Sequence, residues 1–166
     1  QSDHKFASEV FVHEFGHSFA GLADEYYSSD VAYEDFYNLK VEPWEPNITT
    51  LVDFYSKWKG LISPGTPVPT PQNSTFSNTT GVFEGGGYMA KGIFRPAIEC
   101  RMKSNEAPGF CETCKAAINS MIDYYTKCSL GKLINTFCLT WTEHCGILMP
   151  MPETTSTNYL TNTMFR

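Results

Sequence analysis

The chain has 166 residues, of which 42% are hydrophobic, 14% aromatic and 18% charged, and its formal net charge is −6. This length predicts one domain, and the many aromatic side chains exclude intrinsic disorder because they can fill a core. The acidic balance, without a cluster of Lys and Arg, excludes nucleic acid as a partner, and no apolar run reaches the roughly 18 residues needed to span a bilayer.

The first predicted element is a helix over residues 3–20, with Asp3 as its N-cap. Four side chains recur there at helical spacing and share one face: Phe6, Val10, His13 and His17. Gly21 ends this helix, and an irregular aromatic and acidic stretch follows to about residue 46. A short helix is then predicted over residues 51–59.

The second half of the chain alternates loops with short elements. Residues 63–80 are rich in Pro, Ser and Thr and predict an exposed loop. Val82 and Phe83 predict a short strand that leads into a tight glycine turn. A second helix is predicted over residues 110–127, and residues 150–166 read as an extended C-terminus. Together these elements predict an α+β fold.

Six cysteines lie in the last two-fifths of the chain: Cys100, Cys111, Cys114, Cys128, Cys138 and Cys145. An even number at short spacings predicts a disulfide framework, whose pairing the spacing does not set. For Cys111-x-x-Cys114 the alternatives are a redox pair or a zinc knuckle completed by Cys138, His144 or Cys145. We favour structural disulfides because no βαβ pattern surrounds the motif.

Three acceptor sequons for N-glycosylation occur in turn-rich stretches, at Asn47, Asn73 and Asn78. N-glycans and disulfides both form in the secretory route. The two features together predict a secreted, glycosylated protein.

The run His13-Glu14-Phe15-Gly16-His17 carries the chemistry. Two histidines at i and i+4 lie one turn apart on one helix face and can bind one Zn²⁺ together. Glu14 then lies beside the open coordination position, where it can take a proton from water and pass it to a leaving amine. The alternative is an ordinary amphipathic helix whose histidines are core or boundary residues.

A third ligand is expected just beyond the helix, where Asp24 and Glu25 follow Gly21. This spacing is similar to that of the metzincin metallopeptidases, with one additional residue between the second histidine and the glycine. We prefer Asp24 as the ligand and Glu25 as a supporting carboxylate. The longer Glu25 side chain also has the reach to bind the metal.

Residues 13–27 closely resemble the signature of the secreted metallopeptidase family named for bacterial IgA peptidase. The resemblance continues through six short runs: residues 46–49, 57–59, 82–88, 92–96, 100–103 and 110–114. It implies a zinc-dependent endopeptidase of metzincin-like architecture, represented mainly by the zinc helix and a disulfide-stapled C-terminal subdomain. It also implies that His13, His17 and Asp24 bind zinc, with Glu14 as general base.

Metzincins place a methionine in a turn beneath the zinc. Met102 matches this position best, and Met89 is the second candidate. As a polarizable floor under the histidines, the methionine would not itself be a ligand.

Tyr88 and Arg95 are candidates to line the substrate cleft, since an arginine can bind a carboxylate through two parallel hydrogen bonds. The alternative is structural: Tyr88 packs, and Arg95 pairs internally with Glu84 or Glu99.

We therefore predict a catalytic region over residues 1–128 and a disulfide-linked irregular extension over residues 129–166. The catalytic region is expected to lack the upstream sheet of metzincins, because only a short segment precedes His13. Expected partners are a protein or peptide substrate and an upstream chain or further domains of the same precursor. The predicted function is secreted zinc-dependent hydrolysis of peptide bonds. The alternative is a non-catalytic extracellular module that retains the fold within a larger assembly.

Overall fold

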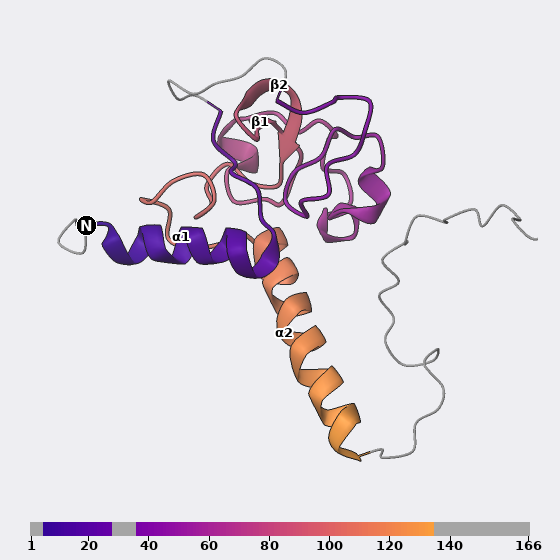
Figure 1. The fold of residues 1–166 in the computed structure, drawn as a ribbon. Coiled ribbons are helices and arrows are strands. Elements are labelled where there is room, and N and C mark those ends of the chain that lie inside the picture. Colours follow the sequence, from indigo (N-terminus) through magenta and orange to yellow (C-terminus); the bar gives the residue numbers. More distant parts are fainter. Residues whose placement is uncertain (1–4, 28–35, 135–166) are drawn as a thin grey trace, which may run out of the picture.

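The computed structural model describes residues 5–27 and 36–134, except for the side chains of residues 128–134 (Figure 1). That part of the chain contains two helices and one two-stranded antiparallel sheet, joined by long irregular connections. The elements are α1 (Ala7–Ala20), β1 (Phe83–Gly86), β2 (Met89–Arg95) and α2 (Glu112–Ile134). The predicted α+β class is therefore confirmed. Helix α1 packs against α2, whose far end projects away from the hairpin.

Helix α1 begins at Ala7, with Phe6 in the N-cap position, and Asp3 lies outside the described residues. It ends where predicted, at Gly21, whose φ of 61° is left-handed and whose N–H donates to the carbonyl of His17 at 3.1 Å. A Cβ on Gly21 would lie 2.6 Å from the ring of Trp44, so this turn requires glycine. The sharp turn brings the following residues back alongside the helix, so that Asp24 contacts His13 and His17.

The helix predicted over residues 51–59 is wrong. Two 3₁₀ turns take its place, η1 (Phe54–Ser56) and η2 (Lys59–Leu61). The cause is tertiary: Trp58 is buried, and its indole N–H donates to the carbonyl of Gly81 at 2.7 Å, which fixes the chain from outside the segment. The loop expected over residues 63–80 is mostly exposed and contains one further 3₁₀ turn, η3 (Ser74–Phe76).

Strands β1 and β2 form a hairpin with the register Phe83↔Arg95, Glu84↔Phe94 and Gly86↔Met89. The sequence indicated the first strand and the turn but not β2, because Lys91 and Gly92 interrupt its apolar pattern. Thr49 adds an isolated bridge to Phe94 from the irregular connection.

Two buried clusters hold these elements together. One joins the end of α1 to the start of α2 through Ala20, Leu22, Cys100, Met102 and Cys114. The other lies under the hairpin and contains Ala23, Ile48, Met89 and Ile93. Leu22 belongs to the first cluster and Ala23 to the second, so the segment after α1 is held from both sides.

The disulfide framework is not confirmed in the described residues. Cys100, Cys111 and Cys114 are free, and the sulfurs of Cys100 and Cys114 lie 3.7 Å apart. A disulfide needs about 2.05 Å. Cys138 and Cys145 lie outside the described residues, as does the side chain of Cys128.

Helix α2 runs without a break across the boundary expected between residues 128 and 129. The rest of the expected extension, residues 135–166, lies outside the described residues. Within the described ranges, no helix combines the length and apolarity needed to cross a membrane.

Candidate functional site

His13 and His17 on α1 come together with Asp24, which lies in the segment after the helix. Nε2 of His13 lies 2.9 Å from Oδ1 of Asp24, Nε2 of His17 lies 3.2 Å from the same oxygen, and the two Nε2 atoms are 3.0 Å apart. The histidines come from adjacent turns of α1, and the turn at Gly21 returns the chain so that Asp24 reaches them. The fold therefore assembles the three side chains that the sequence singled out.

The other ring nitrogens determine what this group can bind. Nδ1 of His13 lies 2.9 Å from the carbonyl oxygen of Arg101, and Nδ1 of His17 lies 2.6 Å from that of Leu22. A carbonyl only accepts, so each Nδ1 carries the proton and each Nε2 keeps its lone pair. Two lone pairs and a carboxylate oxygen thus face one another, an arrangement that a proton or a metal cation relieves. This donor set fits a zinc ion, which takes nitrogen and oxygen ligands.

Tyr88 contacts the same carboxylate from the hairpin turn. Its hydroxyl donates to Oδ2 of Asp24, which leaves Oδ1 facing the histidines, and it accepts a hydrogen bond from Tyr26 at 3.1 Å. The two tyrosine rings meet edge to face, 5.1 Å apart. Tyr88 has a φ of 65°, a region that side-chain-bearing residues rarely adopt and that often marks a functional position.

The charges of the group perturb one another in the metal-free chain. The hydrogen bond with Asp24 is the main cause that raises the pKa of His13. Burial works to raise the pKa of Asp24, but hydrogen bonds from His13 and Tyr88 outweigh it and lower that pKa. Burial, followed by the hydrogen bond to Asp24, raises the pKa of Tyr88. The group therefore favours an ionised Asp24 beside a protonated His13 when no metal is present.

Glu14 is exposed on α1, next in sequence to His13. Its charge is a minor cause of the raised pKa values of both His13 and Tyr26, so it lies close enough to interact with these two side chains. Its carboxylate is accessible to water, as a general base must be.

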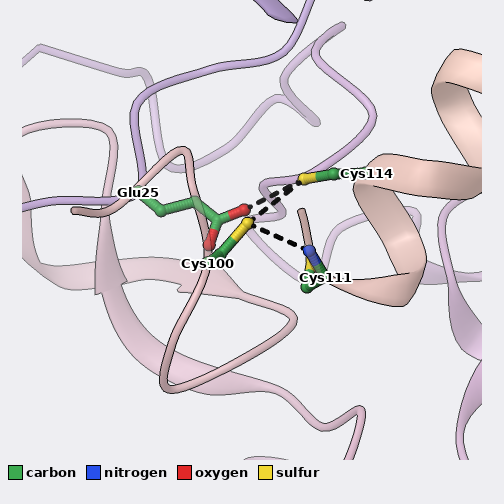
Figure 2. A group of neighbouring side chains, drawn as sticks. All are labelled: Glu25, Cys100, Cys111 and Cys114. Carbon is green, nitrogen blue, oxygen red and sulfur yellow. Dashed lines mark hydrogen bonds between the residues drawn. The ribbon is translucent and has the colours of Figure 1, made fainter. Parts of the chain in front are cut away.

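Glu25, the alternative third ligand, points elsewhere. Its N–H donates to the carbonyl of Met102 at 2.8 Å, and its carboxylate is fully buried. The carboxylate accepts a hydrogen bond from Asn47 at 2.9 Å and lies beside Cys114 (Figure 2). Asp24 and Glu25 therefore belong to different groups, although they are adjacent in sequence.

Met102 lies under α1. It is fully buried, and a Cβ on Gly16 would lie 2.8 Å from its sulfur, so it packs against the helix between the two histidines. Met89 instead packs in the cluster under the hairpin, where its sulfur accepts from the N–H of Tyr37 at 3.3 Å. The geometry distinguishes the two candidates, and Met102 is the one beneath the site.

Arg95 does not line a cleft. Its side chain is 1% exposed, and its guanidinium donates to the carbonyls of Glu84, Gly85 and Ala97. It holds the hairpin to the adjacent loop, so the expectation of a substrate-facing arginine is corrected. The internal partners are these backbone carbonyls and the side-chain oxygen of Gln72, and not the carboxylates of Glu84 or Glu99.

Asn47, a predicted glycosylation acceptor, is buried in the structure. Its side chain is fully buried, accepts from the N–H of Ala23 at 2.7 Å and donates to the carbonyl of the same residue at 2.9 Å. A buried amide whose oxygen and nitrogen both form hydrogen bonds inside the core cannot carry a glycan, so the glycosylation predicted at Asn47 is wrong. Asn73 and Asn78 are exposed and stay as predicted acceptors.

Several contributors to the site were not found from the sequence. The carbonyls of Arg101 and Leu22 orient the histidines through backbone atoms, which leave no sequence signal. Tyr26 directly follows Asp24 and Glu25, and this position is the sequence feature that could have indicated its place beside the site.

A family model described as IgA Peptidase M64 matches residues 1–78 and 72–122. The matched ranges include α1, the hairpin and the first half of α2. A comparison with curated proteins found no match.

Proposed function

The chain belongs to the IgA peptidase M64 family, and on that premise we propose that it is a secreted, zinc-dependent endopeptidase. Membership supports a peptidase that acts on protein or peptide substrates. The observation that carries the finer proposal is the convergence of His13, His17 and Asp24, whose three ligand atoms lie 2.9–3.2 Å from one another.

His13, His17 and Asp24 would hold the zinc ion, and a tetrahedral ion would then keep a fourth position open. When bound, zinc polarises the scissile carbonyl and makes water a stronger acid. The carbonyls of Arg101 and Leu22 keep both imidazoles in the tautomer that a metal needs. Tyr88 keeps the Asp24 carboxylate turned toward the histidines.

Glu14 is proposed as the general base. Its carboxylate takes the proton from the attacking water and returns it to the leaving amine, so that the amine departs neutral. The exposure of Glu14 and its electrostatic effect on His13 support this role.

A metzincin-like architecture is proposed for the same region. A zinc helix that ends at a left-handed glycine, a carboxylate ligand three residues later and a methionine packed beneath the helix all support it. Secretion and glycosylation are proposed on the two exposed sequons, Asn73 and Asn78.

The test is hydrolysis of a fluorogenic protein substrate by the purified chain, together with measurement of its zinc content. Glu14→Gln should lower the rate by about 100-fold or more, because general-base catalysis contributes about that much, while zinc content stays unchanged. Asp24→Asn should lower zinc content as well as rate. Glu9→Gln, on the same helix, is the matched control and should change neither.

Two outcomes would overturn the proposal. An unchanged rate for Glu14→Gln would assign the base to another residue. A wild-type chain that binds zinc at the histidines and hydrolyses no peptide would favour the non-catalytic extracellular module.

A further inference from the structure

A second group of metal-binding side chains lies apart from the histidines. Glu25, Cys100, Cys111 and Cys114 point toward one another from three segments: the turn after α1, the loop after β2 and the beginning of α2 (Figure 2). One ligand atom from each lies within 4.8 Å of the others. The proposed peptidase chemistry uses none of these four side chains.

The spacings match those around a tetrahedral zinc ion. With Zn–S bonds of about 2.3 Å and a Zn–O bond of about 2.0 Å, tetrahedral geometry places two sulfurs about 3.8 Å apart and a sulfur and an oxygen about 3.5 Å apart. The sulfurs of Cys100 and Cys114 are 3.7 Å apart, and the sulfur of Cys114 lies 3.4 Å from Oε1 of Glu25. The N–H of Cys111 points at the sulfur of Cys100 at 3.4 Å, the kind of outer contact that orients a thiolate ligand.

Glu25 provides independent evidence for a bound cation. Its carboxylate is fully buried; Oε1 accepts from Asn47, but Oε2 is buried and has no hydrogen-bond partner among the described residues. A buried carboxylate oxygen without a partner is costly, and native proteins compensate such atoms with a hydrogen bond or a metal. The guanidinium of Arg95 uses its hydrogen bonds on backbone carbonyls and on Gln72.

A disulfide does not account for the same group. A bond between any two of Cys100, Cys111 and Cys114 would leave the third as a half-buried or buried thiol with no cysteine partner among the described residues. It would also leave Oε2 of Glu25 buried without a hydrogen bond or a bound metal. A dication satisfies all four side chains at once.

We propose that Glu25, Cys100, Cys111 and Cys114 bind a second zinc ion in a closed structural site. Three thiolates and one carboxylate complete a tetrahedron and leave no position for water or substrate, so the site is structural. On binding, the protons of the thiols and of the carboxyl group pass to solvent. This inference does not depend on the proposed peptidase activity.

The location gives the second ion a specific structural role. Glu25 follows Asp24 directly, and Cys100 precedes Met102 by two residues. An ion that links these segments to the start of α2 would hold Asp24 toward the histidines and Met102 beneath α1. It would link separate segments of the chain, as the disulfide bonds predicted from the sequence would have done.

The first measurement is the zinc content of the full chain purified without chelator, where one ion in each of the two groups is expected. Cobalt is then substituted for zinc. Thiolate ligands give an intense sulfur-to-cobalt charge-transfer absorption in the near ultraviolet, which histidine and carboxylate ligands do not give. The wild-type chain should show this absorption.

Variants separate the two sites. Cys114→Ser should lose the charge-transfer absorption and one zinc ion, while Thr113→Ser, its neighbour, should lose neither. Glu25→Gln should release zinc faster to a chelator, because one anionic ligand is removed. The double variant His13→Ala/His17→Ala should lose the other zinc ion and keep the charge-transfer absorption, so failure of the proposed catalytic site is distinguishable from failure of this one.

Mass spectrometry after alkylation in denaturant without reductant gives the decisive control, and it needs no variant. Once the metal is removed, Cys100, Cys111 and Cys114 should all be alkylated. A disulfide that includes any of the three in the chain as purified, whether with one another or with Cys128, Cys138 or Cys145, would overturn the proposal. So would a wild-type chain without the charge-transfer absorption.

Discussion

Replacing Arg95 by methionine should destabilise the chain strongly, although the aliphatic part of the side chain is kept. Arg95 donates at 2.6 Å to the buried carbonyl of Gly85, and at 2.8 and 3.1 Å to the half-buried carbonyls of Glu84 and Ala97. Loss of the buried bond costs about 1–3 kcal/mol, and loss of the other two about 0.5–1.5 kcal/mol each. The free energy of unfolding should therefore fall by about 4 kcal/mol, which corresponds to a melting temperature lower by roughly 8–16 °C.

Urea unfolding followed by circular dichroism measures this change. The matched control is Lys91→Met on the same hairpin, whose side chain is 82% exposed and pairs with Glu84 at 2.9 Å. An exposed pair of this kind contributes about 1 kcal/mol or less. Arg95→Lys should give an intermediate loss, because an ammonium keeps the charge but cannot match the fork of the guanidinium.

One result would refute the reasoning. If Arg95→Met leaves the unfolding midpoint unchanged and abolishes hydrolysis, Arg95 acts on the substrate, as the sequence alone had led us to consider.

The remaining predictions concern Asn47 and His13. Peptide mapping of the chain secreted from a eukaryotic host should find Asn47 unmodified, and a glycan there would contradict its burial. Asn47→Ala should lower the free energy of unfolding by about 2–4 kcal/mol, because it leaves the buried N–H and carbonyl of Ala23 unpaired. In the metal-free chain the pKa of His13 is raised, so its pair with Asp24 stabilises the fold fully below the unfolded value of about 6.5, and this contribution is lost as pH rises through the raised pKa. Urea midpoints of the chelator-treated protein should therefore fall over this window, and His13→Ala should remove the fall; a His13-dependent rise would contradict the sign.

Local periodicity predicted the elements that depend on neighbouring residues. The helix that carries His13 and His17, its end at Gly21 and the second helix all follow from helical spacing and capping, which act within a few residues. Strand β2 and the 3₁₀ turns around Trp58 were missed, because pairing with β1 and burial against Gly81 determine them. The disulfide framework failed in the described residues for a similar reason: spacing along the chain does not report which side chains share a pocket.

The sequence by itself predicted the chemistry that we propose, since two histidines one helical turn apart, a glutamate beside them and a carboxylate beyond a helix-ending glycine are typical of a metal site. Only the tertiary structure showed which of the two adjacent carboxylates, Asp24 or Glu25, lies against the histidines. The segment after Gly21 runs between two buried clusters, and neighbouring residues on it face different sides. Asp24 therefore turns to the histidines and Tyr88, and Glu25 turns to the cysteines. That division depends on contacts up to 89 residues apart in the chain, which no local pattern encodes.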